Sequence, residues 1–164
     1  MGEMNRRDVV GMVAAFAALG AVTAEAQAGG VMVSGGGELA HSAFYAYDKL
    51  AVTKNANGSE VRAVLHGTLP TGEYLEVHET TMPVGQSPHP PHRHTHSEMM
   101  LVREGKIEVT SEGKTQVVEP GGIAFNASGT LHGLKAVGTV AAKYFVVAVG
   151  VQKELPSMVP VQTK

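Results

Sequence analysis

Residues 85–105 of this chain read GQSPHPPHRHTHSEMMLVREG, and they hold four of its eight histidines together with one glutamate, all between His89 and Glu98. Neutral imidazole and carboxylate are ligands of first-row divalent metals, and His-x-His followed closely by Glu is a spacing typical of metal sites. A histidine-rich tract can also be a solvated loop or a loose metal-binding tail. His89 stands among three prolines that favour extended backbone, so we expect it at the rim of a site rather than on a metal.

The spacing of the ligand candidates constrains the backbone between them. His92 and His94 are two residues apart, so on a strand they share a face with Cα atoms about 6.6 Å apart and both rings can reach one ion. On a straight strand Glu98 would lie about 13 Å beyond His94, which is too far for its carboxylate to join them. The chain must therefore bend at residues 95–97. The bend breaks the strand alternation, so His96 either points away, lies beside the metal, or replaces one of the ligands.

A further protein ligand must come from elsewhere in the chain. His132 is the leading candidate, because it lies in a predicted strand directly after the glycine-containing turn at residues 127–130. A lone histidine on a strand is more often an ordinary core or surface residue, and both interpretations stay open on the residues alone.

The rest of the sequence is a series of short β-like runs separated by Gly, Pro, Asn and Ser, with no helix of ordinary length. Turns are predicted at residues 104–105, 112–113 and 120–122, each with a glycine where a positive φ is needed. We expect a loop at residues 50–59. The predicted strands span 60–66, 73–81, 99–103, 106–110, 114–118, 123–126, 131–136 and 141–149. This pattern predicts an all-β fold, an antiparallel barrel or two-sheet jelly roll.

Other side chains have two interpretations each. Glu76 and His78 share a face of one predicted strand and would line a cavity or a solvated surface. Met100 and Val102 would line an apolar pocket or fill the core. We expect core positions for Phe125 and Tyr144, and surface positions for Arg62 and Lys143, the two cations to inspect for an anionic substrate.

Composition limits the classes of function. With 164 residues, 43% of them hydrophobic, and a net charge of −2, the chain has room for one domain. The absence of cysteine excludes disulfides and thiolate ligands, so a metal must be held by nitrogen and oxygen. No basic stripe favours nucleic acid or an anionic membrane, and a small soluble molecule is the expected partner. No phosphate-binding loop or nucleophile motif is present.

The N-terminus predicts export. Arg6 and Arg7 precede an uncharged apolar run over residues 9–24, and residues 24–28 offer two A-x-A cleavage sites. We predict a twin-arginine signal peptide over residues 1–28 and a periplasmic or secreted protein without stable membrane insertion. The alternatives are an uncleaved anchor or a cytoplasmic amphipathic start. A flexible segment (29–41), a β-barrel domain (42–155) and a C-terminal tail (156–164) would follow.

The chain resembles the cupin superfamily in both motifs of that family. The first motif is represented by Gly85, His92, His94, Glu98 and Gly105, with a spacer of six residues in place of five after the first glycine. The second is represented by Gly121, residues 127–129, His132 and Ala136, and here the usual proline and asparagine of the family are missing.

The resemblance implies a cupin-type antiparallel β-barrel, a double-stranded jelly roll. It also implies that His92, His94, Glu98 and His132 bind one divalent ion of iron, manganese, nickel or zinc and leave coordination positions open. Among cupin activities we favour dioxygenase-type oxidation of a small organic molecule. A non-catalytic metal or ligand binder, and a metal-dependent isomerase or lyase with His78 or His96 as base, are the alternatives. Pairing into a homodimer is a further expectation from the family.

Overall fold

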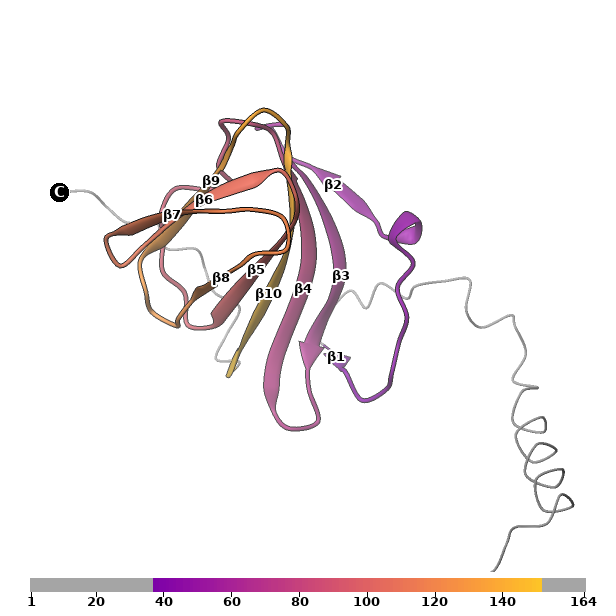
Figure 1. The fold of residues 1–164 in the computed structure, drawn as a ribbon. Coiled ribbons are helices and arrows are strands. Elements are labelled where there is room, and N and C mark those ends of the chain that lie inside the picture. The colour runs from indigo at the N-terminus through magenta and orange to yellow at the C-terminus, as the bar shows by residue number, and fades with distance from the viewer. Residues whose placement is uncertain (1–36, 152–164) are drawn as a thin grey trace, which may run out of the picture. The chain divides into compact units, whose positions relative to one another are not determined.

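The computed structural model describes residues 37–151, which form an all-β domain of two sheets (Figure 1). The elements in chain order are β1 (Gly37–Glu38), the 3-10 turn η1 (Tyr47–Lys49), β2 (Val52–Lys54), β3 (Glu60–Thr68), β4 (Glu73–Met82), β5 (Ser97–Glu104), β6 (Lys106–Ser111), β7 (Lys114–Val118), β8 (Ile123–Asn126), β9 (His132–Val137) and β10 (Ala142–Val151). The larger sheet has the order β1-β3-β4-β10-β5-β8, with β2 also paired to β3, and the smaller sheet has the order β7-β6-β9.

The eight predicted strands are all present, and the predicted all-β fold with two sheets is confirmed. The prediction of a loop across residues 50–59 is wrong at Val52–Lys54, because β2 pairs there with β3. Glu38 and its neighbour Gly37 form β1, parallel to β3, within the segment that we expected to be flexible. Both additions are short edge strands. The residues of β2 are all exposed, so its sequence shows no alternation of apolar and polar residues that would predict a strand. The predicted signal peptide (1–28) and C-terminal tail (156–164) lie outside the described residues.

Strand β10 organises the larger sheet, since it pairs antiparallel with β4 on one side and with β5 on the other. Ala148 of β10 is the register partner of Glu76 on β4 and of Glu98 on β5, so these three residues share the inner face of the barrel. The buried core lies between the two sheets and consists of Met82, Met100, Val102, Ile107, Val109, Ala136, Ala142, Tyr144 and Val146.

The core assignment settles several predictions about apolar side chains. Met100, Val102 and Tyr144 are buried in the core. This confirms the core interpretation of Met100 and Val102 and the predicted core position of Tyr144. The prediction for Phe125 is wrong, because its side chain is 60% exposed. Ala124 and Asn126 take the inner face of β8, so alternation turns Phe125 outward.

The tight connection between β5 and β6 depends on Gly105. Its φ is 69°, and a Cβ built on it would lie only 2.5 Å from the carbonyl oxygen of Ala141. Any larger residue would need both the left-handed conformation and a shift of the neighbouring backbone. The predicted positive φ is also found at Gly113 and Gly121 in the next two turns.

Residues of η1 are held on the outside of the larger sheet by a cluster of charged and aromatic groups. The guanidinium groups of Arg62 and Arg103 lie 4.9 and 5.0 Å from the ring centroid of Tyr47. Arg103 also donates from Nε to Oε1 of Glu79 over 2.8 Å, and the Glu79 side chain is only 1% exposed. This cluster ties the N-terminal part of the domain to β4. Among the residues described, no helix is both long and apolar enough to cross a membrane.

Candidate metal centre

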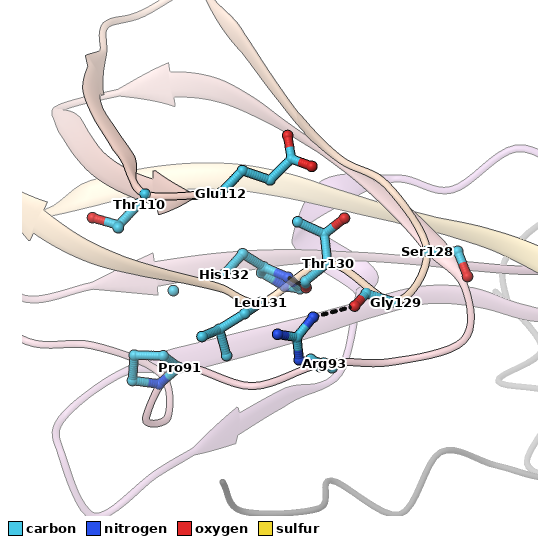
Figure 2. A pocket seen from close by; sticks show the side chains of 11 residues that line it. Pro91, Arg93, Thr110, Glu112, Ser128, Gly129, Thr130, Leu131 and His132 are labelled. Carbon is cyan, nitrogen blue, oxygen red and sulfur yellow. Dashed lines mark hydrogen bonds between the residues drawn. The ribbon is translucent and has the colours of Figure 1, made fainter. Parts of the chain in front are cut away.

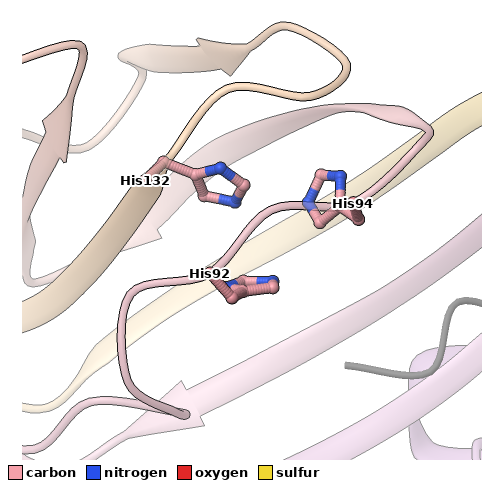
Figure 3. A group of neighbouring side chains, drawn as sticks. All are labelled: His92, His94 and His132. Atoms are coloured by element: carbon pink, nitrogen blue, oxygen red, sulfur yellow. The ribbon is translucent and has the colours of Figure 1, made fainter. Parts of the chain in front are cut away.

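The three histidines of the centre come from two segments that lie side by side (Figure 3). His92 lies in an extended segment before β5 and exchanges backbone hydrogen bonds of 3.0 and 3.1 Å with His132, the first residue of β9. This bridge extends the smaller sheet by one residue and brings His94 to the same place. The predicted bend is present at Thr95 and His96, after which β5 begins.

The bend turns Glu98 back toward the histidines. Oε1 of Glu98 lies 3.0 Å from Nε2 of His132, and Oε2 lies 3.5 Å from Nε2 of His94. Two atoms that each bind one ion at about 2.0–2.2 Å are separated by about 3–4 Å, so these spacings suit a shared ion. The structure thus brings the four predicted residues together, although 40 positions separate the first from the last.

The imidazoles face one another in a buried space. The ring centroids of His92 and His94 are 5.2 Å apart, and those of His132 lie 4.8 Å from His92 and 4.7 Å from His94. Their ligand atoms lie within 4.8 Å of one another. The residues are 8%, 9% and 3% exposed in the order His92, His94 and His132. Such a buried, closely spaced group of nitrogens is suited to a metal.

Backbone carbonyls fix the tautomers of two of these rings. Nδ1 of His94 lies 2.8 Å from the carbonyl oxygen of His96, and Nδ1 of His132 lies 2.8 Å from that of Thr130. A carbonyl only accepts, so each Nδ1 carries the proton and donates it, which leaves the Nε2 lone pair for a metal. Both Nε2 atoms are the ones that face Glu98.

The ionisation states follow from burial and from the shared carboxylate. Burial lowers the pKa of His92 to about 4, and the neighbouring histidines add to the effect. Burial alone would raise the pKa of Glu98, but the adjacent imidazoles of His132 and His94 and the amide of Asn126 lower it overall. Burial likewise opposes protonation of His132, yet Glu98 and the Thr130 carbonyl raise its pKa above the usual value. Glu98 is therefore a carboxylate and His92 is neutral at neutral pH.

Unsatisfied polar atoms show that the donor set fits a cation. Nε2 of His94 and Nδ1 of His92 are buried and have no hydrogen-bond partner within residues 37–151. A buried polar atom without a partner costs about 1–3 kcal/mol, and a divalent ion coordinated by these nitrogens and the Glu98 carboxylate would satisfy them. Imidazole and carboxylate suit iron, manganese, nickel or zinc, and the ligand types do not choose among these metals.

His96 forms an alternative ligand set with His94 and Glu98, whose ligand atoms also lie within 4.8 Å of one another. Its ring stacks on that of His94, with centroids 3.7 Å apart and an angle of 10° between the planes. Burial and the adjacent His94 lower the pKa of His96. We favour the set with His92 and His132, because all three of its histidines are buried whereas His96 is only partly so.

The remaining polar residues singled out in the sequence lie in different surroundings. His89 touches the centre from outside, with its ring centroid 3.9 Å from that of His92, which agrees with a position at the rim. Nη1 of Arg62 lies 3.7 Å from Oε2 of Glu60, and Nζ of Lys143 lies 2.7 Å from Oε2 of Glu104. Neither cation belongs to the group around the candidate metal centre.

Asn126 belongs to the candidate centre although the sequence did not point to it. Its Nδ2 donates to Oε1 of Glu98 over 3.1 Å, and the residue is buried. The predicted strand 123–126 contained it, but the register that places it opposite Glu98 is a tertiary feature without a sequence signal.

Two cavities lie close to the centre. One, of about 430 Å³, lies between edge strands β7 and β8 and includes Asn126, Ser111 and Gln116 in its lining, so it reaches the residue that holds Glu98. The other, of about 730 Å³, lies beside the loop that precedes β9, where Figure 2 shows Arg93 reaching the carbonyl oxygen of Gly129 over 2.6 Å. Its lining residues Thr110 and Gly133 alternate with the inward-facing residues of their strands, and His132 of the centre also belongs to its lining.

Known proteins share this fold. Residues 78–148 match the Cupin_2 family model, described as a cupin domain. No curated protein sequence matches the chain. One similar solved structure is an RmlC-like cupin from Shewanella frigidimarina, which is 17% identical with a TM-score of 0.58 over 69% of this chain and 95% of its own. Another is KdgF from Halomonas sp., which is 21% identical with a TM-score of 0.56 over 66% of this chain and 94% of its own. A cupin-2 domain protein from Rhodospirillum rubrum is 12% identical, with a TM-score of 0.57 over 74% of this chain and 83% of its own. Residues 78–148 thus match a cupin domain, and the similarity to these solved structures confirms the predicted cupin-type jelly-roll fold.

Proposed function

We propose that this chain is an exported, metal-dependent cupin enzyme that acts on a small organic molecule, and we favour dioxygenase-type oxidation. The observation that carries the metal part is the convergence of His94 and His132 on the Glu98 carboxylate, with the His92 ring beside both of these imidazoles. Four protein ligands leave one or two positions of an octahedral or five-coordinate ion open for a substrate or for dioxygen.

The residues of the centre have distinct roles in this proposal. When bound, the metal supplies a Lewis acid and, where it is iron, a centre for the reaction of dioxygen with an organic substrate. The carbonyls of His96 and Thr130 orient the imidazoles of His94 and His132, and Asn126 orients Glu98. The cavity between β7 and β8 offers a small molecule a route toward the Glu98 side of the centre.

Oxygen consumption tests the favoured chemistry. Iron-loaded protein is mixed with phenolic and β-diketone compounds in an oxygen electrode, with a His132→Ala variant as control. The proposal predicts substrate-dependent oxygen uptake by the wild type and at least a hundredfold slower uptake by the variant, since the loss of one ligand disrupts the coordination of the ion. Tight metal binding without oxygen uptake or product would favour the second candidate, a non-catalytic binder.

The location is proposed from the sequence alone. Arg6 and Arg7 before an apolar run support export through a twin-arginine route, which carries folded proteins. Fractionation of cells that express the full chain tests this, with a variant in which both arginines are replaced by lysine as control. We expect a shortened protein outside the cytoplasm for the wild type and full-length protein in the cytoplasm for the variant.

Pairing into a homodimer is a further proposal, supported by edge strand β8. Ile123 and Phe125 are exposed large apolar side chains on this strand, which ends the larger sheet. Exposed apolar edge strands are common sites of association. Sedimentation of the wild type and of a Phe125→Lys variant tests the proposal, which predicts a dimer for the first and a monomer for the second.

A further inference from the structure

A carboxylate and an imidazole on β4 form a hydrogen-bonded pair that the metal centre does not use. Nδ1 of His78 lies 3.1 Å from Oε1 of Glu76, and both side chains are only partly buried. Because they are two residues apart on one strand, they share a face. Tyr74, Thr80 and Met82 have the same parity and are buried, so this is the inner face of the barrel.

The register of the sheet places this pair on the wall beside the metal centre. Glu76 is the partner of Ala148, which is the partner of Glu98, and His78 is likewise linked through Val146 to Met100. Two strand spacings separate Glu76 from Glu98, which is roughly 10 Å between Cα atoms. The residue between them on the inner face is alanine, so no long side chain of β10 stands between the pair and the centre.

The titratable groups around the pair come from three directions. His66 on β3 is the register partner of Glu76, and His96 approaches from the bend before β5. Both imidazoles help to lower the pKa of the Glu76 carboxyl. Tyr74 lies on β4 itself, where burial and the charge of Glu76 raise its pKa. From β10 the facing residues are Ala148 and Val146, which carry no charge.

The hydrogen bond fixes the tautomer of His78. The bond from His78 is the largest cause of a lowered pKa of Glu76, so the carboxylate is ionised at neutral pH and only accepts. Nδ1 of His78 therefore carries the proton that it donates to Glu76, and Nε2 is the ring atom left to accept a proton. An imidazole oriented by a carboxylate in this way is the arrangement of a general base.

We propose that Glu76 and His78 act as the acid–base pair that removes a proton from the substrate as it binds the metal, which makes the substrate a weak acid such as a phenol, a vicinal diol or an enolisable ketone. This inference rests on the proposed metal-dependent function. The O–H or C–H bond of the substrate breaks, its electron pair stays on the substrate as an oxyanion, and the proton forms an N–H bond with Nε2 of His78. The imidazolium is stabilised by the Glu76 carboxylate and can return the proton to the product.

Proton counting tests the pair directly. Zinc-loaded protein is titrated with 4-nitrocatechol in buffers of different ionisation enthalpy, and calorimetry gives the number of protons released per ligand bound. The visible absorption of the ligand reports how many of its hydroxyl groups are ionised. The wild type is expected to release close to one proton fewer than His78→Gln, because it retains that proton, while the ligand is equally ionised in both complexes. Glu76→Gln should shift the count in the same direction.

His66→Gln is the matched control, since His66 lies on the same face beside Glu76 but donates no hydrogen bond to it among the contacts of the described chain. It should release as many protons as the wild type. Equal counts for the wild type and His78→Gln, an equal shift in His66→Gln, or a zinc-loaded wild type that does not bind nitrocatechol would overturn the inference and leave the metal centre standing. A wild type that retains no zinc would overturn both. Zinc content and circular dichroism of each variant check that it has folded. If His78→Gln has not folded, Glu76→Gln provides the decisive comparison.

Discussion

Asn126 donates a hydrogen bond of 3.1 Å from Nδ2 to Oε1 of Glu98, the same oxygen that lies 3.0 Å from Nε2 of His132. The two residues are register partners on β8 and β5. An amide that holds the carboxylate from the cavity side leaves Glu98 one orientation toward the histidines. This relationship makes Asn126 a support of the centre that is not itself a proposed ligand.

Replacing Asn126 with alanine should weaken metal binding without abolishing it. Loss of a residue that orients a metal ligand typically costs about 10–100-fold in affinity. Competition with a chromogenic chelator measures the effect. Gln116→Ala is the control, because Gln116 lines the same cavity and has no bond to Glu98 in the described structure. An unchanged affinity in Asn126→Ala would show that Glu98 does not need this support.

Replacing Gly150 with alanine should disturb the bend that brings Glu98 to the centre. A Cβ at Gly150 would lie 3.0 Å from the Cα and 3.1 Å from the Cβ of His96, so the bend must shift by a few tenths of an ångström. We expect about tenfold weaker metal binding, at the lower end of the range for supporting residues. Chelator competition on this variant and on Val151→Ala, an exposed neighbour on the same strand, measures it. Equal affinities in the two variants would contradict the account.

Metal affinity should fall as the pH drops below neutrality. The pKa of His92 is lowered to about 4, so near neutral pH this ring is already unprotonated and binds metal without losing a proton. The pKa of His132 is raised, so in the metal-free protein its proton competes with the metal from a higher pH than in a free imidazole. Affinity should therefore fall by about tenfold per pH unit below the pKa of His132 on account of the proton that this ring releases when the metal binds. A constant affinity between about pH 7.5 and 5.5 would be incompatible with coordination by His132.

The Arg103 and Glu79 pair should contribute to stability and not to metal binding. Arg103→Ala leaves the buried Glu79 carboxylate without its guanidinium partner, which should lower the free energy of unfolding by about 1–3 kcal/mol. Lys143→Ala breaks an exposed ion pair with Glu104 and should leave the free energy of unfolding nearly unchanged. Urea unfolding of both variants gives the comparison, and equal small changes would show that Glu79 finds another partner.

The sequence predicted the fold because glycine turns and alternating strands are local signals. Each predicted strand needed only its own residues and the turns beside it, and the turn glycines Gly105, Gly113 and Gly121 have the positive φ that was expected. β2 was missed because an exposed edge strand has no buried face and thus no alternation. Phe125 was misplaced because a four-residue strand has too few positions to tell its two faces apart from composition.

For the candidate site, too, the local features could be predicted from the sequence and the pairing of distant strands could not. Parity and bond lengths required a bend before Glu98, and the bend is present at Thr95 and His96. What local reasoning could not supply is the register between distant strands. That register places His92 opposite His132, Asn126 opposite Glu98, and Glu76 across Ala148 from Glu98.

The most direct test of the central claim is the metal content of the purified wild type and variants, measured by mass spectrometry alongside protein concentration. The account predicts close to one divalent ion per wild-type chain and less than a tenth of that in His92→Ala and His132→Ala, with a wild-type content in His41→Ala, whose side chain is exposed and far along the sequence. Full metal content in both His92→Ala and His132→Ala would contradict the site described here.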